Sequence, residues 1–320
     1  LVGSEMCIRD RISFLISESN ILNCFQHLVE DLENSNVILG PGDDAAVIKS
    51  NTKDLVHSLD ISKVGTHFPE YSSPEDIAYR SVAVALSDLA AMGAYPSFIS
   101  IGLSSNIKEI KWYERFTSGI EDILNEYKIK LVGGDVTFGE ISICVNVFGY
   151  PYKSIVKGSG ALCDDQIYIT GPLGTGRKGL EDWKNKKKSN YVESFFRPKI
   201  QFDIAQFISN YATSCIDISD GLVKDLHSVC KLSKVGAIID INKIPITTDI
   251  DDLVYGDDYQ LCFTCSNKNI KHIKDYNFYN IGIIQSNPKI EYMRNNKPVS
   301  FDKERWDCLL YTSPSPRDRN

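Results

Sequence analysis

The sequence lacks the features of a membrane protein and of a disulfide-bonded scaffold. No apolar run approaches the ~18 residues that a membrane-spanning helix needs, and no basic-then-apolar signal pattern follows residue 11. The cysteines number nine, of which seven lie between residues 12 and 307. This odd, scattered set favours reduced thiols over a disulfide framework or a zinc site. We therefore expect a cytoplasmic protein with no membrane partner.

Familiar nucleotide-binding motifs are also missing. There is no GxxxxGK[ST] loop, no GxGxxG between a strand and a helix, and no protein-kinase HRD segment. The glycine-rich stretch 171–176 (GPLGTG) could admit a phosphate or let backbone approach closely, and by itself it is weak support for either. An excess of basic residues is absent too, since the net charge is −7. This charge argues against a nucleic-acid partner but allows phosphate ligands that come with metal ions.

The two ends of the chain differ in character from the rest. Residues 1–11 (LVGSEMCIRDR) and 308–320 (CLLYTSPSPRDRN) fit opposite strands of one DNA segment and look like translated sequencing adapter. The alternative is a disordered native terminus. We expect the native part to cover 12–307, with one domain at 12–150, a second at 151–307, and the joint within 149–165, where Tyr-Pro-Tyr and Gly-Ser-Gly interrupt the pattern.

Strand-like and helix-like patterns alternate along the native part, which predicts an α/β protein. Helices are expected at 75–92, after the start signal Ser-Ser-Pro and before Gly93, and at 220–232. The expected strands are 54–59, 129–132, 141–148, 166–170 and 237–241. The basic run 184–190 (KNKKKSN) is expected to be a solvated loop.

Acidic residues recur beside glycines or at the ends of these elements. Singly, each has a plain reading as a solvated turn or a cap. Asp88 is harder to explain in this way, because its neighbours in Ala85–Ala90 are small and apolar, and an unpaired carboxylate on a buried helix face is costly. Together they favour a site for several metal ions, and oxygen ligands suit Mg²⁺, Ca²⁺ or Mn²⁺ better than zinc or copper. The residues concerned are Asp43, Asp44, Asp60, Asp88, Asp135, Asp217 and Asp220.

At these residues the chain resembles thiamine-monophosphate kinases, a family of the aminoimidazole-ribonucleotide synthetase-like superfamily. The order and spacing of the motifs hold over nearly all of 12–307. The matching stretches are 40–48 (GPGDDAAVI), 65–68 (GTHF), 76–96 (DIAYRSVAVALSDLAAMGAYP), 131–139 (LVGGDVTFG), 215–226 (CIDISDGLVKDL) and 255–264 (YGDDYQLCFT).

The resemblance implies a two-domain fold, with a mixed N-terminal sheet covered by helices on one face and a C-terminal α/β domain. It implies transfer of the γ-phosphoryl of ATP to thiamine monophosphate, assisted by several Mg²⁺ ions, in a homodimer joined through the N-terminal domain. Metal positions would be Asp44, Ser58, Asp60, Asp88, Asp135, Asp217 and Asp220, of which Asp88, Asp135 and Asp220 would be catalytic. ATP contacts would be Gly134, Asp135, Lys157 and Ser219, and thiamine-monophosphate contacts would be His67 and Asp257.

Three positions within 12–307 depart from the family pattern, and the aromatic residue that relatives have a few positions after Trp306 falls in the segment interpreted as adapter. Leu59 stands where threonine is usual, and leucine retains the backbone carbonyl that a metal could use. Gly158 stands where relatives have an arginine that contacts ATP; Lys157 is the substitute we expect, as a point charge in place of a fork. Asp257 is one methylene shorter than the family's glutamate.

The chemistry agrees with this assignment. ATP carries about −4 and the acceptor phosphate about −1.5 to −2, so the two substrates repel unless cations lie between them. Because the acceptor oxygen is already ionised, an in-line transfer needs positioning and charge neutralisation more than a strong general base. Two alternatives remain open: another ATP-using synthetase of the superfamily, and a non-catalytic metal- or nucleotide-binding paralogue.

Overall fold

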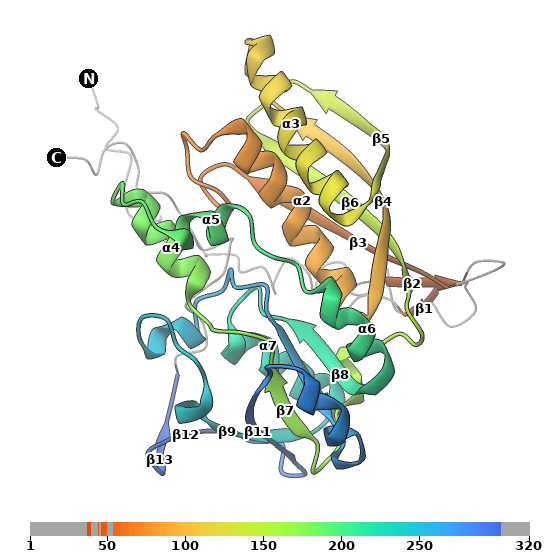
Figure 1. The fold of residues 1–320 in the computed structure, drawn as a ribbon, viewed down its shortest axis with the longest axis vertical. Coiled ribbons are helices and arrows are strands. Elements are labelled where there is room, and N and C mark those ends of the chain that lie inside the picture. Colours follow the sequence, from red (N-terminus) through yellow and green to blue (C-terminus); the bar gives the residue numbers. More distant parts are fainter. Residues whose placement is uncertain (1–36, 40–43, 45, 50–53, 302–320) are drawn as a thin grey trace, which may run out of the picture.

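The computed structural model describes residues 37–39, 44, 46–49 and 54–301, which form two β-sheets with helices packed on them (Figure 1). The predicted mixed α/β class is confirmed. Both terminal segments interpreted as adapter, and Asp43 with the turn before it, lie outside the described residues. Within the described ranges, no helix is both long enough and apolar enough to cross a bilayer.

The N-terminal sheet is mixed, as predicted. Its strand order is β1-β2-β3-β6-β4-β5, with β4 and β5 parallel and the other pairs antiparallel. Two helices cover one face of it, and among the described residues no helix lies on the other face (Figure 1). The elements are β1 (Val37–Leu39), β2 (Ala46–Lys49), β3 (Asp54–Lys63), α2 (Pro74–Ala91), β4 (Ala94–Ser104), α3 (Ile110–Tyr127), β5 (Lys130–Thr137) and β6 (Ser142–Pro151).

Helix α2 confirms the helix predicted at 75–92 and is the central element of the fold. It begins where the hydroxyl of Ser73 accepts the N–H of Asp76 (3.1 Å) and Pro74 occupies the first turn. It ends before Gly93, whose φ of +68° suits glycine. Most of its residues are buried, because it packs against the first sheet on one side and, on the other, against α5 (Asn190–Phe196), α6 (Phe202–Tyr211) and β8 (Ala212–Asp217). Any charge on this helix therefore has to find a partner inside the protein.

Two strands run further than the sequence pattern predicted. Strand β3 continues past Asp60 to Lys63, and β5 continues through Gly133, Gly134 and Asp135 to Thr137. The expectation that the Gly-Gly-Asp segment follows the end of a strand is therefore wrong. Pairing with β4 holds these glycines in an extended conformation, which overrides their local preference for turns.

The C-terminal sheet has the order β13-β12-β9-β11-β7-β10-β8. Helix α7 packs on one face of it and α6 on the other, so the sheet lies between two apolar clusters. The elements are η2 (Gly158–Gly160), β7 (Gln166–Ile169), α4 (Thr175–Lys184), α5 (Asn190–Phe196), α6 (Phe202–Tyr211), β8 (Ala212–Asp217), α7 (Leu222–Ser233), β9 (Gly236–Asp240), η3 (Ile241–Lys243), η4 (Ile250–Leu253), β10 (Leu261–Cys265), η5 (Asn267–Asp275), β11 (Tyr279–Gln285), β12 (Ile290–Arg294) and β13 (Lys297–Val299).

The joint between the sheets lies near the position that the sequence suggested. Strand β6 leaves the first sheet at Pro151, and β7 enters the second at Gln166. The domain boundary at residue 150 stays a prediction. The basic run from 184 links the end of α4 to α5 as a loop, as expected.

Candidate active site

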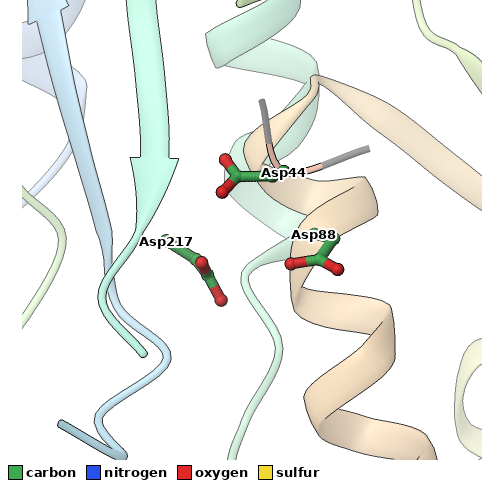
Figure 2. Close-up of side chains that lie close together, drawn as sticks. All are labelled: Asp44, Asp88 and Asp217. Atoms are coloured by element: carbon green, nitrogen blue, oxygen red, sulfur yellow. The ribbon is translucent and has the colours of Figure 1, made fainter. Parts of the chain in front are cut away.

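Three aspartates from distant parts of the chain meet where α2 faces β8 (Figure 2). Asp88 comes from α2, Asp217 from the end of β8, and Asp44 from the segment before β2. One carboxylate oxygen of each lies within 4.8 Å of those of the other two. Asp217 is buried, and Asp44 and Asp88 are partly exposed.

Strand β3 adds further oxygen atoms to this group. The hydroxyl of Ser58 donates to Oδ2 of Asp88 (2.5 Å) and contacts the carbonyl of Asp44 (3.2 Å). Asp60 follows two residues later and therefore lies on the same face of the strand. That face is the helix-covered one, because Asp60 pairs with the fully buried Val145 of β6.

The carboxylates of this site raise one another's pKa values. Burial, with the charge of Asp220 added, raises the pKa of Asp60 to about 6. Burial also raises the pKa of Asp217 to about 7, with further contributions from Asp60 and Asp220. The pKa of Asp88 lies well above its usual range because of burial and then the charges of Asp60, Asp217 and Asp44.

The repulsion among these carboxylates indicates which kind of ligand the site would bind. Lys224 pairs with Asp220 (2.5 Å), but at a position where both side chains are more than a third exposed. The buried carboxylates thus carry mutual repulsion that a bound cation would relieve. The donors are carboxylate and hydroxyl oxygens, which fit Mg²⁺. The structure brings six of the seven predicted metal positions together, namely Asp44, Ser58, Asp60, Asp88, Asp217 and Asp220; their role as ligands stays a prediction.

Asp135 is the predicted metal position that does not join this group. Strand β5 is separated from β3 by β6 and β4, and all of its residues are exposed. Asp135 pairs with Gly102, which lies between the buried Ile101 and Leu103 and so belongs to the opposite face of the sheet. Within one protomer the sheet itself separates Asp135 and Asp60.

The two residues predicted to contact thiamine monophosphate lie close to each other. His67 accepts the Lys63 N–H at Nδ1 (3.0 Å), which leaves Nε2 as the protonated, donating nitrogen. Burial and then the charge of Arg80 lower the pKa of His67, which favours the neutral ring. The carboxylate of Asp257 forms an ion pair with Arg80, and Arg80 also donates to the backbone carbonyl of His67.

Sequence reasoning missed Arg80. It lies on α2 two turns before Asp88 and is almost completely buried. The signal that could have found it is the one used for Asp88, namely a charge within the mostly apolar stretch Ile77–Leu89, which needs a buried partner.

The remaining predicted ATP contacts lie on both sides of the joint between the sheets. Ser219 lies between Asp217 and Asp220 in the turn before α7. Lys157 is exposed, and its carbonyl accepts the N–H of Cys215, which precedes Asp217 by two residues on β8. Gly134 lies beside Asp135 on β5, which β4 and β6 separate from β3.

The glycine-rich turn at the start of α4 holds an internal carboxylate. Asp258 accepts the N–H groups of Gly174 (2.8 Å), Thr175 (2.9 Å) and Gly176 (3.3 Å). These are the donors that a phosphate would use at a helix N-terminus. Of the two possibilities that the sequence left open, the structure therefore shows close approach of the chain and not a vacant phosphate cradle.

We expect Asp258→Ala to destabilise the protein by ~2 kcal/mol, because three backbone donors lose a buried acceptor. The melting temperature should fall by about 4–8 °C in thermal unfolding followed by circular dichroism. Asp203→Ala is the matched control, since Asp203 lies in the first turn of α6 with its side chain 84% exposed. Equal melting temperatures for the two variants would show that the carboxylate does not hold this turn.

Comparison with known proteins agrees with the order of motifs. Residues 42–150 match the family model described as AIR synthase related protein, N-terminal domain. The chain is 37% identical to the thiamine-monophosphate kinase of Buchnera aphidicola from Schizaphis graminum, over 87% of this chain and 94% of that protein. It is 33% identical to the thiamine-monophosphate kinase of Escherichia coli O157:H7, over 85% and 92% of the respective chains.

Solved structures show the same relationship. The structure described as "AaThiL complexed with AMPPCP and TMP" superposes with a TM-score of 0.79 at 27% identity, over 89% of this chain and 95% of that one. Coverage of 89% of this chain means that the similarity extends over both sheets.

Proposed function

The chain belongs to the thiamine-monophosphate kinase family, and from that premise we propose that it transfers the γ-phosphoryl group of ATP to thiamine monophosphate, forming thiamine diphosphate and ADP. The observation that carries this proposal is the group of Asp44, Asp88 and Asp217, whose carboxylates lie together where α2 faces β8. A relative that holds AMPPCP, an analogue of ATP, together with TMP supports this pair of substrates.

We propose that Mg²⁺ ions are held by the six grouped positions, with the carboxylates of Asp44, Asp88 and Asp217 as the principal ligands. When bound, Mg²⁺ would neutralise the phosphate charges of donor and acceptor. Ser58 fixes the orientation of Asp88 through its 2.5 Å hydrogen bond. His67, with its donating Nε2, would hold the acceptor phosphate, and no side chain needs to remove a proton from it.

The helix-free face of the N-terminal sheet supports a homodimer. Leu59 (48% exposed) and Ile61 (54%) of β3 lie on this face, and Val132 (62%) of the edge strand β5 and Phe138 (79%), just after β5, are also exposed. Exposed apolar groups on a sheet and its edge strand are typical of a protein interface. We propose that two copies pair through this face; the role of Asp135 as a metal ligand stays a prediction.

Val132→Asp should weaken this dimer by at least tenfold in dissociation constant, because a charge would be buried in an apolar contact. Sedimentation velocity over a range of concentrations measures the change. Ile110→Asp is the matched control: Ile110 is 70% exposed at the start of α3, on the helix-covered side. Dimers that resist Val132→Asp as well as Ile110→Asp would contradict an interface at this face.

The activity itself is tested by incubating the protein with ATP, Mg²⁺ and thiamine monophosphate and separating the products by chromatography. We expect thiamine diphosphate and ADP in equal amounts, and neither product when Mg²⁺ is replaced by a chelator. ADP without thiamine diphosphate would refute thiamine monophosphate as acceptor, and the absence of both would refute the kinase. The cytoplasmic location stays a prediction, consistent with free cysteines throughout the described residues.

A further inference from the structure

A buried arginine connects the two residues expected to bind the acceptor. The side chain of Arg80 is 3% exposed, and its guanidinium donates to acceptors on three separate segments. Nε donates to the carbonyl of His67 (3.0 Å), one terminal nitrogen to the carbonyl of Phe195 (2.5 Å), and the other to the carboxylate of Asp257. Its plane also lies over the ring of Phe195, 4.1 Å from the centroid. The planar fork of arginine suits this arrangement, since one ammonium group cannot reach three acceptors so disposed.

The segment that Arg80 holds through Asp257 has an uncommon backbone conformation. Asp257 and Tyr259 both have positive φ, +74° and +50°, which costs free energy for residues other than glycine. The hydroxyl of Tyr259 donates to the same carboxylate oxygen of Asp257 that Arg80 contacts (2.9 Å). Side-chain contacts from two directions thus fix the carboxylate of Asp257, and they offset the cost of the backbone conformation.

The same segment lies directly against the turn that carries the metal group. The N–H of Asp257 donates to the carbonyl of Ser219 (2.8 Å), and the N–H of Tyr259 donates to that of Ile218 (2.9 Å). Gly256 approaches Ser219 so closely that a Cβ would lie 1.7 Å from its carbonyl oxygen. A displacement of Asp257 would therefore change the position of the acceptor site relative to Asp220.

We propose that Arg80 is a positioning residue for the phosphate acceptor. It holds Asp257 of the second domain and His67 of the first at a fixed separation beside the metal group, so that thiamine monophosphate binds with its phosphate directed at the nucleotide. This inference rests on the proposed function. It also accounts for aspartate in place of the family's glutamate at position 257, because the long side chain of Arg80 reaches across the joint between the domains to the shorter carboxylate.

The test uses Arg80→Gln and Arg80→Lys in the full chain, with Arg197→Gln as matched control. Arg197 also connects α5 to the first domain, through Asp76 and Asp122 and over the ring of Tyr79, 4.8 Å from its centroid. It is not bonded to His67 or Asp257, so its loss weakens the joint without touching the acceptor site.

For Arg80→Gln we expect the KM for thiamine monophosphate to rise about 10–100-fold, because one or two charged hydrogen bonds are lost. The KM for ATP and the affinity for Mn²⁺, measured by electron paramagnetic resonance, should stay within about threefold of the unchanged protein. Arg80→Lys should recover part of the acceptor affinity. Adding Asp257→Asn to Arg80→Gln should raise the KM little further, because the two side chains act as one unit.

An equal rise in both KM values, or the same acceptor KM in Arg197→Gln as in Arg80→Gln, would overturn the proposal and leave Arg80 a general structural contact. If Arg80→Gln does not fold, Arg80→Lys decides alone, and an unchanged acceptor KM there overturns it. Failure of the proposed function is distinct, because the unchanged protein would then form no thiamine diphosphate at all.

Discussion

Asp88→Asn should lower phosphoryl transfer by about a thousandfold or more, the scale expected when charge stabilisation at a phosphoryl transition state is lost. Asp88 lies at the centre of the acidic group, where its pKa is affected by Asp60, Asp217 and Asp44. Asparagine keeps the shape and the hydrogen bond to Ser58 but removes the charge that would hold Mg²⁺. The measurement is kcat at saturating ATP, thiamine monophosphate and Mg²⁺, together with Mn²⁺ binding.

Asp76→Asn is the control for this prediction. Asp76 lies on the same helix and carries the same charge, but it is paired with Arg197 away from the metal group. We expect its kcat within about twofold of the unchanged protein. If Asp88→Asn retained more than a tenth of the activity, Asp88 would not be a ligand of a catalytic metal.

The second large effect concerns stability without metal. In the folded protein the pKa of Asp60 is raised to about 6 and that of Asp217 to about 7, from a value of 3.8. Between about pH 4 and pH 7 the folded state therefore binds more protons at these residues than the unfolded chain does. Their contribution to the free energy of unfolding is present at the acidic end and is lost as the pH rises. We expect the metal-free protein to lose stability across this range.

Asp217→Asn should remove part of the loss of stability that the metal-free protein shows as the pH rises. At pH 8, without divalent metal, the variant should melt about 4–8 °C higher than the unchanged protein, corresponding to relief of ~2 kcal/mol from one buried, uncompensated carboxylate. With Mg²⁺ and a non-hydrolysable ATP analogue the order should reverse, since only the unchanged protein keeps its full set of ligands.

Thermal unfolding at pH 5, 6.5 and 8, each with chelator or with Mg²⁺, measures both effects. Asp203→Asn is the control, because that carboxylate is exposed and should leave the curves unchanged. A melting temperature of metal-free Asp217→Asn at or below that of the unchanged protein would contradict repulsion within the group.

Much of the site could be predicted from local pattern alone. The apolar neighbours of Asp88 in the sequence predicted a buried charge that needs a partner, and in the fold α2 brings Asp88 next to Asp44 and Asp217. The alternation of strands and helices predicted the α/β class, because the period of buried positions is a property of each element by itself. Motif order over the whole chain identified the family, which the relatives confirm.

Tertiary structure alone decided which of these residues meet. Asp60 and Asp135 looked equivalent in the sequence, yet strand order and register put them on opposite faces of one sheet. Arg80 and Asp257 are 177 positions apart, and their contact exists only because α2 packs between the two sheets. By its sequence the glycine-rich turn could hold a phosphate, but in the fold the carboxylate of Asp258 accepts its N–H groups. A sequence pattern shows which face of its own element a side chain occupies, but long-range packing decides what that face meets.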